Sequence, residues 1–296
     1  MISICIPIYN FDVRPLVRDL LYQTSLFKNL PIEIVLIDDA SDINFQEINH
    51  ELKNFVNFIQ LDQNIGRSNI RNLFLKYTTQ PYLLFLDCDG LIHHNPNFIS
   101  NYLESTNQNL DVVCGGRIYS EKCPHKNVSL NWKYGNKVES PAIIRSFMSN
   151  NFLIKRRVFE LILFDETIRY YGHEDTLFGI ELIKNNIQII IIDNSVFNAH
   201  LENNKTYLEK NISSLNNLNQ LIKSNKIKVE EFQYIKLLNF YLQLEKYRLT
   251  PIYSKFYSVI KQHIYANLLS HNPNLTYFNL YKLGEFIRIK KESTTK

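Results

Sequence analysis

An apolar run ends in two carboxylates at Leu83-Leu84-Phe85-Leu86-Asp87-Cys88-Asp89-Gly90. The run is typical of a buried β-strand, and open α/β folds bind their ligands beyond the carboxyl ends of such strands. Two carboxylates one residue apart supply hard oxygen ligands for Mg²⁺ or Mn²⁺, whose remaining positions water and phosphate oxygens can fill. Because Asp also ends many strands simply by suiting turns, the pair alone indicates a metal site only weakly.

Other motifs strengthen this interpretation through their order along the chain. They are Ile2-Ser3-Ile4-Cys5-Ile6-Pro7-Ile8-Tyr9-Asn10, Ile34-Val35-Leu36-Ile37-Asp38-Asp39-Ala40-Ser41, Asn64-Ile65-Gly66-Arg67 with Arg71-Asn72, and Tyr171-Gly172-His173-Glu174-Asp175. Together with the Asp-Cys-Asp stretch, they resemble the family 2 glycosyltransferases, which have the GT-A fold. The resemblance covers about the first two hundred residues and implies a fold and a reaction class, but not the identity of the sugar.

Composition is that of a globular protein. The 296 residues are 45% apolar and 13% aromatic, enough for one large domain or for a domain with an appendage. The net charge of +4 is mild, and Lys and Arg are spread rather than clustered, which does not indicate a nucleic-acid partner. The four cysteines form no C-x-x-C pair, so we interpret them as free thiols in a reducing compartment.

The sequence predicts neither a transmembrane span nor a signal peptide. The longest apolar run, Ile189–Ile192, is far shorter than the roughly 18 residues that a span needs. Met1 leads directly into a strand-like segment without a basic region or a cleavage site. We therefore expect a cytoplasmic location, with peripheral contact at the inner face of the membrane as an open alternative.

Short apolar runs alternate with segments of helical period, which predicts parallel βα units in an α/β fold. The expected strands are Ile2–Ile8, Glu33–Ile37, Phe55–Gln60, Tyr82–Leu86, Asp111–Gly115, Phe152–Ile154, Gln188–Asp193 and Ser195–Ala199. The expected helices are Val13–Gln23, Asn44–Lys53, Arg67–Lys76, one from about Arg156, and Asp175–Lys184. This arrangement agrees with the Rossmann-like GT-A domain that the resemblance implies.

The character of the chain changes near Glu202. Beyond it glycine almost vanishes, and amphipathic stretches near Tyr207–Lys223, Val229–Tyr247 and Pro251–Leu269 predict helices. We therefore expect a GT-A glycosyltransferase domain over residues 1–202 and a helical C-terminal region over residues 203–296. These helices could pack on the catalytic domain, form a homo-oligomer, or contact a membrane surface.

Asp39 follows the second strand, where the resembling family places a carboxylate that faces the nucleotide base. An ionised Asp only accepts hydrogen bonds, so it can recognise uracil N3–H or guanine N1–H but not cytosine, which lacks such a proton. The alternative is that Asp38 or Asp39 merely caps the next helix. The resemblance implies further nucleotide contacts at Pro7, Tyr9, Asn10, Arg71 and Asp87.

The resemblance also assigns the metal ligands. It implies that Asp87 lies near the ribose and the waters of the metal, and that Asp89 binds the metal directly. In some members of the family a histidine completes the metal shell, and His200 stands at the corresponding place. Imidazole suits Mn²⁺ in a mixed site, although a lone histidine at a strand end is more often structural. Ser149-Asn150-Asn151-Phe152 is similar to the family segment beneath the donor sugar, with asparagines where small residues are common.

The pair Glu174-Asp175 predicts the catalytic base. An inverting transfer needs a group that removes the proton of the acceptor hydroxyl, and a carboxylate at a helix N-terminus can do this. Asp175 matches the base of the family, and Glu174 is expected to orient acceptor hydroxyls. The alternative is that Asp175 is only an N-cap for the helix that begins at Thr176.

The sequence thus predicts an inverting, Mn²⁺- or Mg²⁺-dependent glycosyltransferase of hexosyl or N-acetylhexosaminyl type. The expected donor is a nucleotide-diphosphate sugar, with UDP favoured, and the resemblance implies a glycan or lipid-linked glycan acceptor in surface polysaccharide synthesis. A metal-dependent nucleotidyltransferase would need a Gly-rich loop with Arg and Lys after the first strand, which Pro7-Ile8-Tyr9-Asn10-Phe11-Asp12 lacks. A non-catalytic nucleotide-sugar-binding scaffold would be favoured by loss of Asp89 or Asp175, and both are present.

Overall fold

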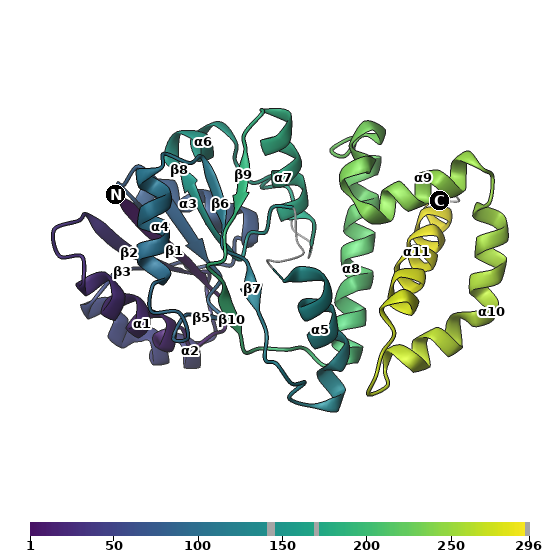
Figure 1. Cartoon of the computed structure of the whole chain (residues 1–296), viewed down its shortest axis with the longest axis horizontal. Coiled ribbons are helices and arrows are strands. Elements are labelled where there is room, and N and C mark those ends of the chain that lie inside the picture. Colours follow the sequence, from purple (N-terminus) through teal and green to yellow (C-terminus); the bar gives the residue numbers. More distant parts are fainter. Residues whose placement is uncertain (141–145, 169–171, 294–296) are drawn as a thin grey trace. The chain divides into compact units, whose positions relative to one another are not determined.

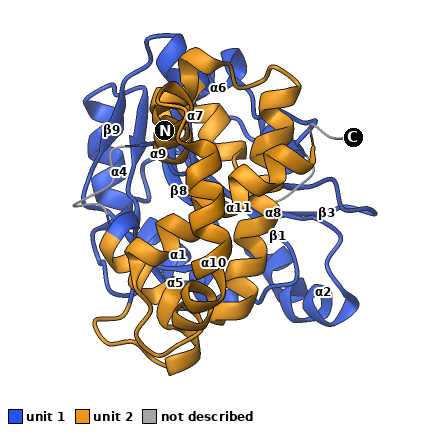
Figure 2. Ribbon diagram, turned by 90° about the vertical axis from the view of Figure 1, so that its right-hand side faces the viewer, with its two compact units in different colours: residues 1–119, 138–169, 181–200 blue, residues 120–137, 170–180, 201–296 orange. Residues whose placement is uncertain are grey.

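Figure 1 shows the computed structural model, which describes residues 1–140, 146–168 and 172–293. The chain divides into two compact units (Figure 2). Unit 1 comprises residues 1–119, 138–169 and 181–200, and unit 2 comprises residues 120–137, 170–180 and 201–296. Unit 1 therefore ends near the boundary expected from the sequence, but two short segments that precede this boundary belong to unit 2.

A seven-stranded sheet forms the centre of unit 1, in the order β3-β2-β1-β4-β8-β6-β9. Its strands are β1 (Ile2–Ile8), β2 (Ile32–Asp38), β3 (Asn57–Gln60), β4 (Tyr82–Leu86), β6 (Val112–Cys114), β8 (Asn151–Lys155) and β9 (Ile189–Ile191). All neighbouring strands are parallel except β8, which runs antiparallel to β4 and β6. The near-continuous apolar sequences of β1 and β4 follow from burial of both faces of the sheet.

Helices follow the strands of this sheet and cover it. They are α1 (Arg14–Ser25), α2 (Ile43–Asn49), the 3₁₀ turn η1 (His50–Asn54), α3 (Arg67–Tyr77), α4 (Phe98–Asn107) and α6 (Arg156–Leu161). Leu16, Val17 and Leu20 are buried on one face of α1 at helical spacing and join the core of the sheet. Unit 1 therefore has a mixed α/β architecture, as expected from the sequence.

A second, three-stranded sheet of unit 1 has the order β5-β10-β7. It is formed by β5 (Gly90–Leu91), β10 (Val196–Asn198) and β7 (Arg117–Ile118). Gly90 pairs with Asn198, and Arg117 pairs with Val196. The small sheet thereby brings together the residues that directly follow Asp89, the strand that carries Arg117, and the strand that leads to His200.

Unit 2 is helical. It contains η2 (Lys126–Val128), α5 (Ser129–Tyr134), α8 (Asn204–Lys223), η4 (Val229–Tyr234), α9 (Lys236–Lys246), α10 (Thr250–Leu268) and α11 (Leu275–Glu292), while η3 (Gly135–Glu139) and α7 (Glu174–Lys184) run across the division between units. Leu208, Tyr257, Ile264, Phe278 and Tyr281 form the centre of its core. No helix in the described part of the chain is long and apolar enough to cross a membrane.

Most expected elements are present, but several differ; the stretch expected as one helix at Val229–Tyr247, for example, is divided into η4 and α9. The strand expected at Phe55–Gln60 begins at Asn57, because Phe55 ends the 3₁₀ turn η1 with its N–H bonded to the carbonyl of Leu52. The helix expected at Asn44–Lys53 is divided into α2 and η1. The last helix, α11, was not expected, because its polar and apolar residues do not separate into a clear stripe when it is buried between α8 and α10.

Candidate functional site

The loop after β1 is tied to the loop after β2. Asn10 adopts a left-handed backbone conformation with φ 51°, which Asn tolerates better than most residues. Its side-chain amide donates to Asp42 at 3.1 Å, and its side-chain oxygen accepts from the backbone N–H of Asp42 at 2.7 Å. Tyr9 is 54% exposed beside it. Pro7 is tolerated in a central strand because the pairing of β1 with β4 stops at Cys5.

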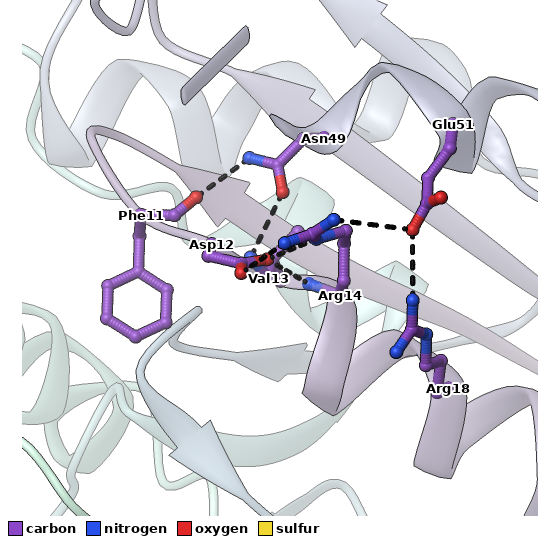
Figure 3. Close-up of polar contacts among 7 residues, drawn as sticks. All are labelled: Phe11, Asp12, Val13, Arg14, Arg18, Asn49 and Glu51. Carbon is purple, nitrogen blue, oxygen red and sulfur yellow. Dashed lines mark hydrogen bonds and ion pairs between the residues drawn. The ribbon is translucent and has the colours of Figure 1, made fainter. Parts of the chain in front are cut away.

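The residues that follow this loop are fixed by a buried amide and an ion-pair network, shown in Figure 3. Asn49 donates to the carbonyl of Phe11 at 2.7 Å and accepts from the N–H of Val13 at 3.1 Å. Arg14 contacts both carboxylate oxygens of Asp12 at 2.8 Å. The ring of Phe11 in turn meets the ring of His200 edge-on, with centroids 4.8 Å apart. The hydrogen bonds of Asn49 thus hold the segment that places the Phe11 ring against one side of the His200 ring.

Asp39 lies at the end of β2, where it is 4% exposed. Its carboxylate accepts from the backbone N–H groups of Ile65 at 2.7 Å and Gly66 at 3.0 Å. Burial raises the pKa of Asp39 against the effect of these two hydrogen bonds. Gly66 has φ 84°, which favours glycine and lets the chain turn into α3. Asp39 therefore organises the turn into α3, and a carboxylate has further lone pairs with which to accept from a ligand.

Asp38 fixes the turn that follows β2. Its carboxylate accepts from the N–H of Ser41 at 2.7 Å, which stabilises the turn after β2. The hydroxyl of Ser41 accepts from the N–H of Asn10 at 2.8 Å. Asp38 does not cap α2, whose N-cap residue is Asp42.

Arg71 from α3 and Asp87 from the end of β4 form a hydrogen-bonded ion pair. The guanidinium donates to Asp87 at 2.9 Å, and its carbon lies 5.4 Å from the centre of the Phe164 ring. The following residue, Asn72, donates to the carbonyl of Phe164 at 2.9 Å and accepts from its N–H at 3.0 Å. The first turns of α3 therefore hold both the acidic strand end and the segment around Phe164.

Asp89 has charged neighbours of both signs. Burial and then the nearby charge of Asp87 raise the pKa of Asp89, while Arg117 and His200 act in the opposite direction. Burial, Asp89 and Asp87 also raise the pKa of the Cys88 thiol, which favours its protonated form. An acidic pair that is partly removed from water attracts a cation.

The importance of Arg117 was not recognised from the sequence. Burial alone would lower its pKa, but Tyr119, Glu139, Asp87 and Asp89 raise it, and its buried Nε has no hydrogen-bond partner. The signal in the sequence was the preceding pair Gly115-Gly116. A Cβ on Gly115 would come within 2.4 Å of the Asn194 carbonyl, so only glycine permits this turn into β7.

Two asparagines at the start of β8, Asn150 just before the strand and Asn151 as its first residue, have different surroundings. Asn151 is fully buried and satisfied: it accepts from the Tyr102 hydroxyl at 2.5 Å and donates to the carbonyls of Gly116 and Asn194 at 2.9 Å. The side-chain amide of Asn150 is buried without a partner for either its oxygen or its nitrogen. The carbonyl of Asn150 accepts from the N–H of Asp87 at 2.9 Å. Asn150 therefore has an unused donor and acceptor on its side chain, and its backbone pairs with that of Asp87.

Glu174 and Asp175 form the first turn of α7 and belong to unit 2. The chain enters this helix through Gly172 and His173, both with positive φ, and a Cβ on Gly172 would collide with Ser214. Asp175 accepts from the N–H of Thr176 at 2.7 Å, and Glu174 is 6% exposed. Burial lowers the pKa of His173 to about 4, so the imidazole is neutral. Tyr171, the first residue of the motif, lies outside the described residues.

Asp87 and Asp89 are the candidate metal ligands. Within the described ranges, no group of three or more His, Cys, Asp or Glu side chains is arranged to hold a metal ion. A site of two carboxylates nevertheless fits Mg²⁺ or Mn²⁺ when a substrate diphosphate supplies further oxygens. His200 acts electrostatically on Asp89 and packs against Phe11. Its role as a metal ligand stays a prediction, as do the other sequence-predicted site roles.

Comparison with known proteins decides the family. The model of the family described as "Glycosyl transferase family 2" matches residues 3–163, which is more than half of the chain. The chain belongs to glycosyl transferase family 2. The matched region contains all of β1 except Ile2, as well as Asp39, Arg71 and the Asp87-Cys88-Asp89 stretch. The protein is therefore a glycosyltransferase, as predicted.

Curated relatives are similar to this chain over most of its length. The chain is 25% identical to the poly(ribitol-phosphate) beta-N-acetylglucosaminyltransferase TarP of Staphylococcus aureus (strain N315), over 75% of this chain and 72% of TarP. It is 24% identical to the minor teichoic acid biosynthesis protein GgaB of Bacillus subtilis (strain 168), over 94% of this chain. The chain spans only 34% of the length of GgaB.

Solved structures share the fold. The mannosyltransferase PcManGT from Pyrobaculum calidifontis, in complex with GDP-Man and Mn²⁺, superposes with a TM-score of 0.60 at 12% identity, covering 99% of this chain and 86% of that chain. Residues 1–349 of S. aureus TarS, in complex with UDP-GlcNAc, superpose with a TM-score of 0.52 at 16% identity, covering 99% of this chain and 91% of the TarS chain. At these identities the likeness establishes the GT-A fold alone.

Proposed function

We propose that this family 2 enzyme transfers a sugar, with inversion, from a UDP-sugar to a hydroxyl group of a surface glycan or lipid-linked glycan. The observation that carries the proposal is the acidic end of β4, where Asp87 and Asp89 lie among Arg71, Arg117 and His200. A diphosphate with a divalent cation complements such a mixture of charges, because the metal meets the carboxylates and the arginines meet phosphate oxygens.

The nucleotide would lie along the carboxyl ends of β1 and β2, with the backbone of Pro7, Tyr9 and Asn10 flanking the base. Asp39 would accept from uracil N3–H while it retains the N–H groups of Ile65 and Gly66. UDP is favoured because TarP is named as an N-acetylglucosaminyltransferase and TarS was solved with UDP-GlcNAc. The GDP-Man bound to PcManGT makes GDP the alternative to be tested.

Asp89 would bind Mn²⁺ or Mg²⁺ directly, with Asp87 and His200 as further candidates for its shell. A bound divalent cation neutralises the charge of the departing diphosphate. Arg71 orients Asp87 through their hydrogen bond. Arg117 contributes a second positive charge at the same place. The unused amide of Asn150 would contact the donor sugar.

Asp175 would remove the proton of the acceptor hydroxyl as this oxygen attacks the anomeric carbon, and Glu174 would orient the acceptor. The bond from the sugar to the diphosphate breaks in the same step, so no covalent enzyme intermediate forms. Catalysis would occur in the cytoplasm. The division into a catalytic domain over residues 1–202 and a helical region over residues 203–296 belongs to the same proposal.

The direct test is thermal stabilisation of the full chain by a panel of UDP, GDP and CMP sugars, each with Mn²⁺, with Mg²⁺ and with EDTA. Specific binding raises the melting temperature through mass action. We expect UDP-sugars with metal to stabilise most and EDTA to remove most of the effect. Transfer is then measured with the donor that binds best.

Asp39→Ala provides the control for base selectivity. Because Asp39 also holds the turn into α3, the variant should melt lower, and the comparison must therefore use the ratio of UDP to CMP affinity. This ratio should fall towards one. Equal affinity of the unmodified protein for CMP and UDP would refute base recognition by Asp39.

A further inference from the structure

Helix α10 carries an exposed apolar stripe formed by Ile252, Phe256 and Val259. These residues are 66%, 53% and 79% exposed, and their spacing of four and three residues places them on one face of the helix. Tyr247 and Leu249, in the turn before α10, are also exposed. Large apolar side chains in a row on one helix face mark an interaction surface more often than isolated ones do.

The opposite face of α10 is the one that holds the helix in unit 2. Tyr257, Ile264 and Leu268 are buried there and pack in the same cluster as Phe278 and Tyr281 of α11. Lys261 and Tyr257 also contact the buried carboxylate of Glu285. The fold therefore does not depend on the stripe, and polar replacements in the stripe should leave α10 in place.

Charge is unevenly divided along the chain, which the mild net charge of the whole sequence conceals. Residues 201–296 contain 15 Lys and Arg against 7 Asp and Glu, whereas residues 1–200 contain 18 against 22. Helix α10 itself contains no acidic residue. Lys246, Arg248 and Lys255 are exposed near the first half of the stripe. The surface thus combines apolar side chains with positive charge.

We propose that this face of α10, with the turn before it, binds the surface of an anionic lipid bilayer. Ile252, Phe256 and Val259 would enter the boundary between headgroups and acyl chains, and the basic residues would contact anionic headgroups. A second copy of the chain suits the surface less well, because contact between two such faces brings like charges together. A polyanionic glycan would satisfy the basic residues but would leave the apolar stripe in water.

The stripe is short, so binding is reversible and depends on the anionic lipid. From Ile252 to Val259 the helix rises only about 10 Å. Apolar contact of this size gives weak adsorption, which attraction between basic residues and anionic lipid strengthens and which salt weakens. The proposal concerns a surface of unit 2 and does not rest on the proposed donor or acceptor.

The test is flotation of the full chain with vesicles of phosphatidylcholine alone and with added phosphatidylglycerol. We expect binding only with phosphatidylglycerol, decreasing as salt is raised. The variant Ile252→Ser/Phe256→Ser/Val259→Ser should bind at least about 10-fold more weakly, and Lys246→Gln/Arg248→Gln/Lys255→Gln should do the same. Matched controls elsewhere are Tyr22→Ser/Ile43→Ser/Leu161→Ser and Lys28→Gln/Lys122→Gln/Lys126→Gln, which should bind as the unmodified chain does.

Three results would overturn the proposal. The first is absence of binding to anionic vesicles by the unmodified chain. The second is an oligomer, measured by light scattering, that the stripe variant converts to a monomer while vesicle binding is unchanged, because the occupant would then be a second copy. The third is a combination of two results: the chain binds polyphosphate only when the basic residues are present, and the stripe variant binds vesicles as well as the unmodified chain does. Each variant should bind UDP as the unmodified chain does, which shows that it is folded. The result of this test is thereby separate from that of the proposed function.

Discussion

Arg71 donates a hydrogen bond of 2.9 Å to Asp87, and the two side chains are 5% and 34% exposed, respectively. The guanidinium is thus removed from water while its partner faces the site. Asp89, two residues on, has the charges of Arg117 and His200 nearby. The two aspartates therefore differ in environment: a hydrogen-bonded ion pair holds Asp87, and we expect Asp89 to be the one that binds a cation directly.

Arg71→Met should lower both stability and nucleotide binding. Loss of the guanidinium removes the Asp87 pair and the contact with the Phe164 ring, which should cost about 1–3 kcal/mol of unfolding free energy. Urea denaturation measures this loss. Arg157→Met is the matched control, because Arg157 is 74% exposed and contacts Asp111 only at the surface, so its loss should cost less than about 1 kcal/mol. Equal losses in the two variants would contradict the importance of the buried pair.

Asp89→Ala should abolish metal-dependent UDP binding and leave the fold intact, as circular dichroism and calorimetric titration with Mn²⁺ and UDP would show. Asp87→Ala should weaken binding and also lower the melting temperature, because it leaves the buried Arg71 without its partner. If Asp89→Ala retained unchanged metal dependence, Asp89 would not be the metal ligand.

Arg117→Met should change the affinities for metal and nucleotide in opposite directions. Removing a positive charge near Asp87 and Asp89 should strengthen binding of Mn²⁺ alone by about 3- to 10-fold. Loss of a cation that meets phosphate oxygens should weaken binding of UDP in the presence of Mn²⁺ by about 10-fold or more. Electron paramagnetic resonance of free Mn²⁺ gives the first constant and calorimetry the second. Arg117→Lys keeps the charge, so both of its affinities should lie between those of the unmodified chain and those of Arg117→Met. If Arg117→Met instead weakened the binding of Mn²⁺ and of UDP together, the role of Arg117 would be purely structural.

His173 should make the stability of the protein depend on pH. Burial depresses the pKa of its imidazole from 6.5 to about 4, with Glu174 opposing and Lys282 assisting this shift. The neutral form thus stabilises the folded state above pH 6.5, and this contribution is lost as the pH falls from 6.5 towards 4. The difference in unfolding free energy between the unmodified chain and His173→Asn should decrease by on the order of 1–2 kcal/mol between about pH 7.5 and pH 5. Asn is chosen because it tolerates the positive φ at this position. If the difference in unfolding free energy between the two proteins were constant with pH, His173 would not be buried in its neutral form.

The fold followed from the sequence where local pattern and tertiary environment agree. Ile2–Ile8 and Tyr82–Leu86 were predicted to the residue, because strands buried on both faces are continuously apolar and end at polar residues. The sequence could not predict the antiparallel direction of β8 or the buried helix α11. Both are determined by packing between segments that are far apart in the chain.

The site was predictable where chemistry shows in a short motif, and less so elsewhere. The aspartates could be recognised because each follows an apolar run that is typical of a strand. Arg117 lies in a two-residue strand, and its relation to Asp89 depends on the pairing of β7, β10 and β5 across about eighty residues of chain. The unsatisfied amide of Asn150 and the fully bonded amide of Asn151 are adjacent in sequence. Only the alternation of side chains along the chain gives them different surroundings.

The last prediction separates chemistry from capping at Asp175, whose carboxylate accepts from the N–H of Thr176 in the first turn of α7. Asp175→Asn keeps the shape and an oxygen acceptor but cannot take a proton. If Asp175 is the base, donor and metal affinity should remain nearly unchanged while transfer falls by on the order of 10²–10⁴. If it is only a cap, the variant should lose about 1 kcal/mol of stability and keep its turnover.

Asp165→Asn is the matched control for this variant, because Asp165 also accepts from a backbone N–H, that of Thr167 at 2.9 Å, and has no assigned catalytic role. It should show a small loss of stability and normal turnover. Glu174→Gln should raise the KM for the acceptor more than it lowers kcat, since an orienting group acts mainly on binding. If Asp175→Asn retained near-normal turnover and Glu174→Gln lost it with unchanged donor affinity, the base would be Glu174, and Asp175 would stabilise the start of α7.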